Sequence, residues 1–259
     1  MKEQLLLIVP DAHGRTFWKN GVNNIEGYKR VIFLGDYVDP YPFEGISEEA
    51  AIGNFKEIID LKKANPEKVV LLLGNHDMPY FSDDYLKLAN WHSRHSETNH
   101  DTIAKLFHDN MSCFKLAYSE DDVLFTHAGC TSGWIETVFP SFDFENESIN
   151  DLCNAINQLA ATPECVKKLY MVTWSRGGFD KTGSCIWADV EETAAEQMDE
   201  GIVHPIKTVK QVFGHTLLAF DTDEGIVYGD PIEAGNMKML DTHKAFELAP
   251  KSFTITPCK

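Results

Sequence analysis

Short apolar runs alternate with a helical pattern along the first third of the chain. The runs cover Leu5–Val9, Val31–Leu34 and Val69–Leu73, and turn residues stand at their ends. Continuous apolar runs of this length are typical of strands that are buried on both faces of a sheet. Between the last two runs, Ser47-Glu48-Glu49 predicts a helix start and Asn65-Pro66 predicts its end. The pattern therefore predicts an α/β fold that begins with a βαβαβ unit of parallel strands.

The rest of the chain is expected to mix helices with further short strands. Mainly helical segments are predicted near residues 80–116 and 130–170, with a strand at Val123–Thr126 between them. Short β runs return in the last third of the chain, at Val209–Phe213, Leu217–Phe220, Gly225–Tyr228 and Met237–Leu240. Because no repeat, low-complexity tract or long linker divides the sequence, residues 1–259 are expected to form a single domain in which the two helical segments are inserts.

Polar clusters follow the three N-terminal strands at the point where each strand ends. They are Asp11-Ala12-His13-Gly14, Gly35-Asp36-Tyr37-Val38-Asp39 and Gly74-Asn75-His76-Asp77, and His127 and His215 follow two later strands in the same way. The carboxyl ends of parallel strands meet at one crevice of an open sheet, so we expect these side chains to converge. Carboxylate, imidazole and amide donors suit divalent cations such as Mn²⁺, Fe²⁺ or Zn²⁺. The joint pattern predicts a dinuclear metal site.

The composition narrows the class of protein and of partner. The chain has 40 acidic against 23 basic residues, a net charge of −17, and 43% of its residues are hydrophobic. That apolar fraction excludes general disorder, and so acidic a surface repels nucleic acids and anionic membranes at long range. No run approaches the roughly 20 apolar residues of a membrane span, and no signal peptide is recognised. Six cysteines without CxxC pairs indicate reduced thiols and a cytoplasmic location.

Taken in order, these motifs resemble the calcineurin-like metallophosphoesterase superfamily. The motif Gly35-Asp36-Tyr37-Val38-Asp39, together with Trp174-Ser175, is similar to the motifs of the phosphoprotein-phosphatase branch of this superfamily. That branch includes bacterial Ser/Thr protein phosphatases and symmetrical diadenosine tetraphosphatases. The resemblance implies a sandwich of two mixed β-sheets flanked by helices, with two divalent metal ions at its rim. Manganese is the expected metal, with iron, zinc and magnesium as alternatives.

The resemblance also implies a role for each matching residue. Asp11 and His13 would hold one metal, and Asp36 would bridge both. The second metal would take the three remaining ligands, which are Asn75, His127 and His215. A hydroxide that bridges the metals would attack phosphorus, His76 would protonate the leaving oxygen, and Asp39 would orient His76. Leu217 stands where many members have a further histidine, which favours the phosphatase-like ligand set.

The expected phosphate clamp is missing from its usual place. Relatives follow Val-Asp with Arg-Gly, and that arginine grips the substrate phosphate, whereas this chain has Pro40-Tyr41. The chain contains four arginines. We expect Arg176 to be the clamp and Arg15 a second phosphate-binding residue, with Arg94 ranked below both, because a guanidinium group suits bidentate phosphate contact. Alternatively, each arginine pairs with one of the many surface acids.

The combined expectation is an enzyme that hydrolyses phosphomonoesters, with phosphoserine or phosphothreonine in proteins as the leading substrate. A nucleotide hydrolase of the diadenosine tetraphosphatase type is the alternative, and a phosphodiesterase comes third. A metal-binding scaffold without turnover is disfavoured, because every ligand and the general acid are present. Tyr41 or Trp134 could stack on an aromatic leaving group, although core packing is the more ordinary use of such residues. The oligomeric state stays open.

Overall fold

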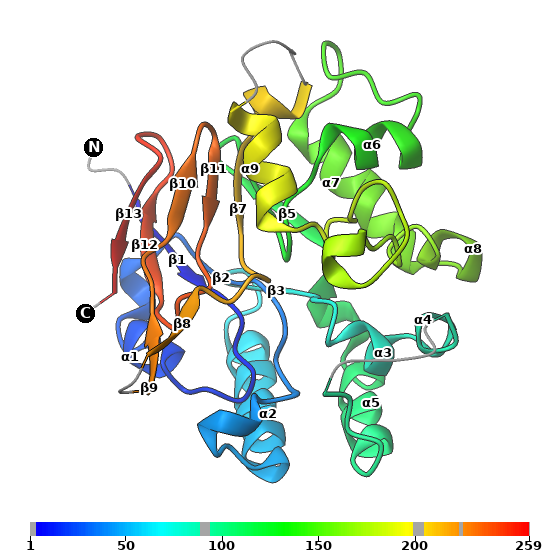
Figure 1. The fold of residues 1–259 in the computed structure, drawn as a ribbon. Helices are drawn as coiled ribbons and strands as arrows, with labels where there is room; N and C mark the ends of the chain where they lie inside the picture. The colour runs from blue at the N-terminus through cyan, green and yellow to red at the C-terminus, as the bar shows by residue number, and fades with distance from the viewer. Residues whose placement is uncertain (1–3, 89–93, 199–204, 223–224, 259) are drawn as a thin grey trace. The chain divides into compact units, whose positions relative to one another are not determined.

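The computed structural model describes residues 4–88, 94–198, 205–222 and 225–258. The chain is a mixed α/β protein with two main mixed sheets flanked by helices, as the sequence predicts (Figure 1). It divides into two compact units, and each is described by itself. The first unit comprises residues 1–115 and 243–259, and the second comprises residues 116–242. In the described part of the chain, no helix has both the length and the apolar character of a membrane span.

The first unit contains a six-stranded sheet in the order β13-β12-β1-β2-β3-β4. Strands β1 to β4 are mutually parallel, and β12 and β13 add to the edge of β1 in antiparallel fashion. The predicted βαβαβ unit is therefore confirmed. The strands are β1 Leu6–Val9, β2 Arg30–Phe33, β3 Val69–Leu72, β4 Phe114–Lys115, β12 Phe246–Ala249 and β13 Thr254–Pro257.

The helices of this unit lie between its parallel strands. They are α1 Trp18–Val22, α2 Glu48–Ala64, α3 Met78–Phe81, α4 Asp83–Leu86 and α5 His100–His108, with short 3-10 turns η1 Ile25–Gly27, η2 Pro42–Glu44 and η3 Met111–Cys113. Helices α3, α4 and α5 fall in or beside the predicted helical segment at 80–116, of which residues 89–93 lie outside the described residues.

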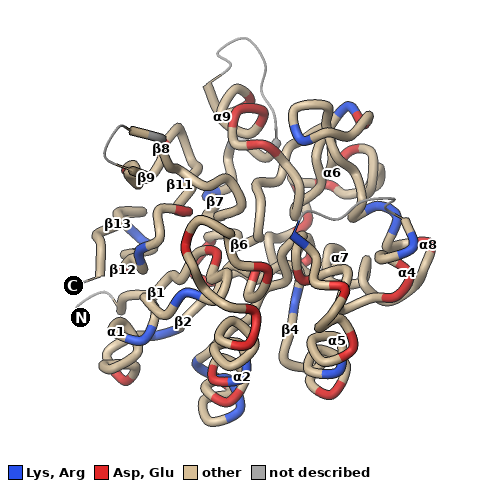
Figure 2. The backbone as a smooth tube through the Cα atoms, turned by 60° about the horizontal axis from the view of Figure 1, so that its bottom comes forward, with Lys and Arg blue, Asp and Glu red and all other residues tan. Residues whose placement is uncertain are grey.

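Helix α2 shows how local signals produce an element of the core. The side chain of Ser47 accepts a hydrogen bond from the backbone of Ala50, and the acidic Glu48 and Glu49 occupy the first turn. Acidic and basic residues occur along α2 (Figure 2), and the helix, which packs on β3, buries Phe55. Its ring stacks on Tyr37 with centroids 5.1 Å apart and packs 4.6 Å from Phe107. The core beneath α2 therefore contains a cluster of aromatic rings.

The second unit contains a five-stranded mixed sheet in the order β10-β11-β7-β6-β5 and a separate hairpin of β8 and β9. The central strands β6, β7 and β11 are parallel, and β5 and β10 are antiparallel edges. The strands are β5 Ala117–Glu120, β6 Val123–Thr126, β7 Lys210–Phe213, β8 Ala219–Thr222, β9 Gly225–Tyr228, β10 Ile232–Ala234 and β11 Met237–Met239.

Two helices of the second unit pack against this sheet, and α6, α7 and α8 fall in the helical segment predicted near residues 130–170, whereas α9 lies beyond it. Helix α7 packs against β5 and β6, and α9 packs against β10 and β11. The helices are α6 Ser132–Val138, α7 Ile149–Asn157, α8 Pro163–Val166 and α9 Val190–Met198, with 3-10 turns η4 Gln158–Ala160, η5 Trp174–Arg176 and η6 Pro205–Thr208. Trp134 is fully buried, and its Nε1 donates to the carbonyl of Lys168, so its role is core packing.

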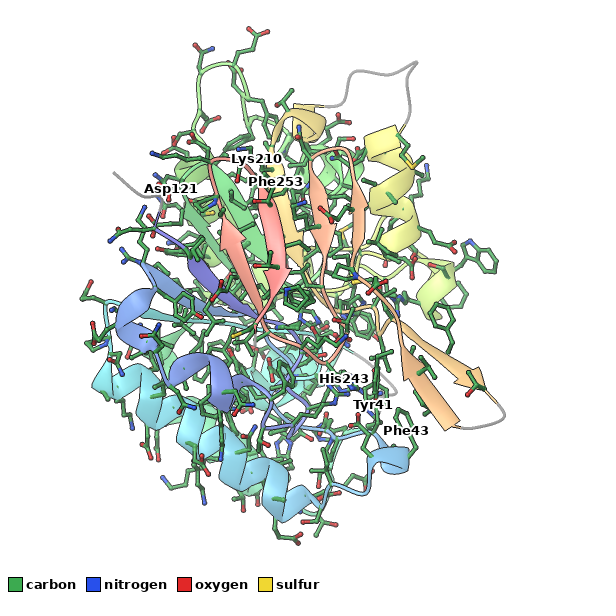
Figure 3. The ribbon with its side chains drawn as sticks, turned by 90° about the vertical axis from the view of Figure 1, so that its left-hand side faces the viewer. Tyr41, Phe43, Asp121, Lys210, His243 and Phe253 are labelled. Carbon is green, nitrogen blue, oxygen red and sulfur yellow. The ribbon has the colours of Figure 1, made fainter. Side chains whose placement is uncertain are left out.

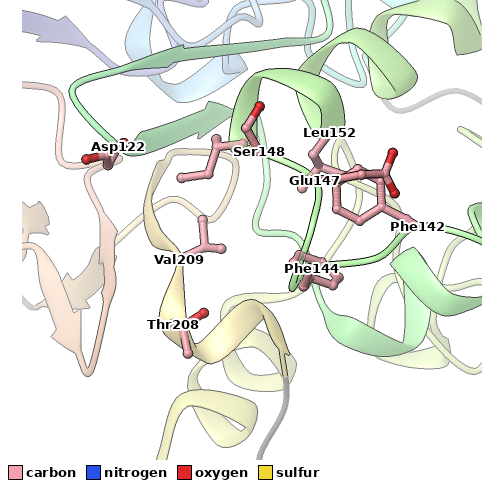
Figure 4. A pocket seen from close by; sticks show the side chains of 9 residues that line it. Asp122, Phe142, Phe144, Glu147, Ser148, Leu152, Thr208 and Val209 are labelled. Atoms are coloured by element: carbon pink, nitrogen blue, oxygen red, sulfur yellow. The ribbon is translucent and has the colours of Figure 1, made fainter.

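A cavity of about 300 Å³ lies within the second unit (Figure 4). Its lining combines apolar side chains, among them Phe142, Phe144 and Leu152, with the polar Asp122 and Ser148. None of the predicted site residues lines it.

The aromatic core predicts a clear contrast between two phenylalanine variants. Phe55 is fully buried, so Phe55→Ala is expected to lower the free energy of unfolding by about 3–5 kcal/mol through lost burial and a residual cavity. Phe43 is 51% exposed, so Phe43→Ala is expected to change it by about 0.5 kcal/mol or less. Urea unfolding measures both, and equal losses in the two variants would contradict the assignment of this core.

Candidate metal centre

The loop after β1 holds His13 in one orientation. The Nδ1–H group of His13 donates to the carbonyl of Val38 at 2.8 Å, and the backbone N–H of His13 donates to the carbonyl of Asp36 at 2.7 Å. Because Nδ1 carries the proton, the lone pair of the ring lies on Nε2, which is 3.4 Å from Asp36 Oδ2. His13 is 1% exposed. The ring is therefore arranged to bind a cation through Nε2.

The carboxylate of Asp77 ties together the loops after β2 and β3. Its Oδ2 accepts from the backbone N–H groups of Asp36 at 2.7 Å and Gly74 at 2.8 Å, and its Oδ1 accepts from the N–H of Tyr37 at 3.0 Å. Asp77 is fully buried. Three charge-assisted hydrogen bonds fix the position of Asp36 relative to the next loop. The sequence motif contains Asp77, but sequence reasoning did not assign it this role.

Two glycines permit the close approach of these loops. A Cβ atom on Gly35 would lie 2.6 Å from the backbone nitrogen of Gly74, and Gly35 has a φ of +109°. A Cβ atom on Gly74 would lie 2.1 Å from Oδ1 of Asp36. Both distances are too short for real atoms, so the carboxylate of Asp36 occupies space that only glycine leaves open.

The first unit brings together a group of possible metal ligands. His13, Asp36 and His76 each offer one ligand atom, and these atoms lie within 4.8 Å of one another. All three side chains are buried, and so are the predicted ligands Asp11 and Asn75 in the same loops. The charge of Asp11 acts on Asp36. The donors are imidazole nitrogen, carboxylate and amide oxygen, a set that fits a divalent metal.

Burial shifts the pKa values of Asp36 and His13 in the directions that favour the neutral form of each group. Desolvation raises the pKa of Asp36 to about 7, and the neighbouring Asp11 carboxylate adds to the shift. Desolvation also lowers the pKa of His13 well below its usual value, with help from the charges of His76 and Arg94. A neutral imidazole is the form that binds metal, and a cation would stabilise the ionised form of Asp36.

His76 and Asp39 form a pair at the edge of this group. His76 Nδ1 lies 3.0 Å from Asp39 Oδ2, and the backbone N–H of His76 donates to Asp36 Oδ1 at 2.9 Å. The hydroxyl of Tyr80 donates to Asp39 Oδ1 at 2.6 Å and accepts from the backbone of Ser96 at 2.7 Å. Burial raises the pKa of Asp39 to about 7. The chain thus fixes both oxygens of the carboxyl group that faces the imidazole.

The structure places two of the arginines in the first unit close to these residues. Arg15 Nε donates to both carboxylate oxygens of Glu44, at 2.8 and 3.0 Å, and Nη1 donates to the carbonyl of Asp11. Arg94 Nη2 donates to Nε2 of His13 at 3.3 Å and to Nε2 of His76 at 3.1 Å. Arg15 directly follows the Asp11-Ala12-His13-Gly14 motif, whereas Arg94 lies outside the motifs, and for this reason the sequence favours Arg15 over Arg94.

The second unit brings together His127, His215 and Arg176. Nε2 of His127 lies 3.2 Å from Nδ1 of His215, and the N–H of Gly214 donates to the carbonyl of His127 at 2.8 Å. Arg176 donates through Nη2 to the hydroxyl of Thr216, and its Nε lies 2.7 Å from a carboxylate oxygen of Asp189. Two predicted ligands and one predicted phosphate-binding residue therefore lie together in this unit.

Several predicted site residues have strained backbone conformations. The φ angles of His13, Asp36, Asp39 and His215 are +42°, +54°, +57° and +70°. Residues other than glycine rarely adopt positive φ, and such strain is concentrated at functional sites. Packing and hydrogen bonds compensate for the strain and point these side chains in fixed directions.

The three hydrogen bonds of Asp77 predict a large effect of a small change. In Asp77→Asn, an amide N–H₂ group would face a backbone N–H, so at least one buried donor would lose its acceptor. We expect a loss of about 2–4 kcal/mol in the free energy of unfolding and weaker metal binding. Calorimetric titration with Mn²⁺ and urea unfolding measure both effects. The exposed Asp101→Asn on α5 serves as the control, and an Asp77→Asn variant that matches it would contradict this role.

The raised pKa values predict how pH changes the stability of the chelator-treated protein. Asp36 and Asp39 titrate at about 7 when folded, against 3.8 without the fold. When folding raises the pKa of a carboxyl group, the protonated group stabilises the folded protein at low pH. That stability is fully present below the pKa of the unfolded chain, and it is lost as pH rises through the pKa of the folded protein. We therefore expect stability to fall between about pH 4 and 7, by on the order of 1.4 kcal/mol per pH unit for each carboxyl group. Urea unfolding in EDTA at several pH values should show that the free energy of unfolding changes less steeply with pH in Asp36→Asn than in the wild type. An equally steep change in both proteins would refute the prediction.

Comparison with known proteins places the chain in a family. The sequence model of the calcineurin-like phosphoesterase family matches residues 8–182, and no curated protein is similar enough to count as a match. One solved structure, of a protein whose assignment as a diadenosine tetraphosphatase is itself provisional, aligns at 14% identity with a TM-score of 0.46 over 99% of this chain and 94% of that chain. Because the family match spans well over half of the 259 residues, the chain belongs to the calcineurin-like phosphoesterases and is a metal-dependent phosphoester hydrolase.

Proposed function

We propose that this phosphoesterase hydrolyses phosphomonoesters, with phosphoserine and phosphothreonine in proteins as the leading substrate class. The observation that carries the proposal is the position of His76 and Asp39. A buried imidazole with its Nδ1 on a carboxylate lies against the candidate ligands His13 and Asp36. In metal-assisted hydrolysis of a monoester, the metal site activates water and a proton donor beside it assists the departure of a poor leaving group.

The proposed metal ligands are those of the family motifs. Asp11, His13 and Asp36 would hold one cation, and Asp36 would share a second cation with Asn75, His127 and His215. Oxygen and nitrogen donors without thiolate favour Mn²⁺ over softer ions. When bound, the two cations supply Lewis-acid activation of water and of the phosphate oxygens. The cytoplasmic location and the single domain formed by residues 1–259 stay predictions.

Residues of this chain would supply the proton that the leaving group needs. Asp39 holds Nδ1 of His76, so Nε2 is the atom that faces the candidate ligands and would protonate the leaving oxygen. Tyr80 holds the other oxygen of Asp39 and prevents the carboxyl group from rotating away. The role of Asp39 is therefore to orient the imidazole and to stabilise its charged form.

We propose Arg176 as the main phosphate-binding residue and Arg15 as the second. Arg176 lies beside Thr216, which follows His215 directly, and this supports a position near the phosphate. Arg15 Nη2 is buried and has no hydrogen-bond partner among the described residues, which leaves one donor for a substrate oxygen. The ion pairs of these arginines with Asp189 and Glu44 would compete with phosphate.

Leaving-group dependence tests the role of His76. In His76→Asn with Mn²⁺, we expect turnover of a phosphoserine peptide to fall by about 10²–10⁴-fold, because the serine oxygen needs a proton as it leaves. Turnover of p-nitrophenyl phosphate should fall less, since nitrophenolate leaves readily without one. The exposed His108→Asn on α5 is the matched control and should retain full activity.

The same assay, extended to other substrates, decides between functions. Faster turnover of diadenosine tetraphosphate or of bis-p-nitrophenyl phosphate than of the phosphopeptide would replace the monoester proposal. A protein that binds Mn²⁺ and hydrolyses none of these substrates would overturn it. Equal losses on the peptide and on p-nitrophenyl phosphate would show that His76 is not the general acid.

A further inference from the structure

The guanidinium group of Arg94 faces the candidate metal ligands of the first unit. Its Nη2 donates to His13 Nε2 at 3.3 Å and to His76 Nε2 at 3.1 Å. The first atom is the one through which His13 would bind a metal, and the second is the one from which His76 would release its proton. Arg94 therefore lies within hydrogen-bond distance of the proposed metal-binding atom of His13 and of the proposed proton-donating atom of His76.

Arg94 also differs from the other arginines near predicted site residues in what surrounds its charge. Arg15 pairs with Glu44 and Arg176 pairs with Asp189, whereas Arg94 forms no ion pair with a carboxylate in the part of the chain that the structure describes. Among those same residues its Nη1 has no hydrogen-bond partner. The charge of Arg94 acts on the nearby carboxyl groups of Asp36 and Asp39 without a direct ion pair to either. A partly buried guanidinium that is not paired directly with a carboxylate is suited to bind an anion.

Tyr41 holds this guanidinium in place. The Cζ atom of Arg94 lies 3.7 Å from the centre of the Tyr41 ring, and Nε donates to the carbonyl of Asp39 at 3.1 Å. The Tyr41 ring also contacts the His13 ring edge-on, at 5.1 Å between centroids, and lies beside Phe43 (Figure 3). Tyr41 belongs to the Pro40-Tyr41 pair that replaces Arg-Gly of the relatives. Tyr41, from the pair that stands in place of Arg-Gly, therefore contacts Arg94, an arginine from a distant part of the chain.

The segment that follows Arg94 is fixed to the same loops. The backbone N–H of Ser96 donates to the hydroxyl of Tyr80, which in turn donates to Asp39. The hydroxyl of Ser96 donates to Glu48 at the start of α2. These contacts anchor residue 96 to Asp39, three residues from the proposed bridging ligand Asp36. Arg94 is thus held by a continuous set of hydrogen bonds.

We propose that Arg94 binds the substrate phosphate and that Tyr41 is its positioning residue, an inference that rests on the proposed function. In the loaded enzyme, His13 Nε2 would be occupied by metal and His76 Nε2 would carry a proton. Neither atom would then accept from Arg94, so the phosphate oxygens become the acceptors for Nη1 and Nη2. Arg94 would thus bind the phosphate as the family arginine does, from a different position in the sequence.

Inorganic phosphate is the probe that tests this assignment independently of turnover. Calorimetric titration of the Mn²⁺-loaded protein is expected to show about 10–100-fold weaker phosphate binding in Arg94→Ala, the loss that follows from removing charged hydrogen bonds. Arg94→Lys should stay nearly as weak, because an ammonium group lacks the planar fork. Added guanidinium ion should restore part of the binding to Arg94→Ala. Arg30→Lys, at the start of β2, is the control.

Kinetics on p-nitrophenyl phosphate tests the positioning role of Tyr41. Tyr41→Leu should raise KM by about 10-fold and leave the bound Mn²⁺ unchanged, whereas Tyr41→Phe, which keeps the ring face, should resemble the wild type. Metal content and circular dichroism confirm that each variant is folded and loaded. A Tyr41→Leu variant with normal KM would overturn the positioning role.

The outcomes separate this inference from the proposed function. If Arg94→Ala binds phosphate as tightly as the wild type, Arg94 is not a phosphate-binding residue, even where turnover supports the enzyme assignment. If the wild type binds phosphate through Arg94 but hydrolyses no monoester, the proposed function fails and the assignment of Arg94 stands. Arg94→Gln provides a second variant of similar length if Arg94→Ala does not fold.

Discussion

The buried carboxylate of Asp77 is the constraint on which the first unit's site depends. Three backbone N–H groups, from Asp36, Tyr37 and Gly74, converge on its two oxygens. These N–H groups belong to the loops after β2 and β3, so one side chain sets the distance between them. Without that carboxylate, buried donors would lack acceptors and the loops would separate. The positions of Asp36 and His76 follow from this contact and from the glycines beside it.

Further hydrogen bonds fix the orientation of the side chains at this site. Val38 fixes the tautomer of His13, Asp39 fixes the imidazole of His76, and Tyr80 fixes Asp39. Each polar group is oriented by another group that is itself buried, which reduces the reorganisation needed when a charged ligand binds. Burial raises the pKa of Asp36 and lowers that of His13, and a bound divalent cation would offset the cost of burying the ionised carboxylate of Asp36.

Much of this arrangement could be predicted from the sequence, because its signals are local. The apolar runs of β1, β2 and β3 and the cap of α2 at Ser47 are read from a few neighbouring residues. Parallel strands bring their carboxyl ends to one edge, which places Asp11, Asp36 and His76 in neighbouring loops. The order of the motifs was sufficient to indicate the family to which the chain belongs.

The remaining features depend on contacts between distant residues. Strand β12 pairs with β1, and β13 pairs with β12, so the place of both strands in the sheet depends on contacts between the two ends of the chain. Asp77 stands next to His76 in the motif, yet its three amide partners cannot be inferred from spacing. Arg94 reaches Asp39 across 55 residues, and the only local hint is an aromatic Tyr41 where a glycine is usual.

Anomalous diffraction at the manganese edge, from crystals grown with Mn²⁺ and inorganic phosphate, can locate the ions themselves. We expect two peaks with the carboxylate of Asp36 bound to both, and a phosphate held against them by Arg94. Peaks that Asp36 does not touch, or a single ion bound away from His13 and Asp36, would contradict the metal site on which the enzymatic mechanism is built.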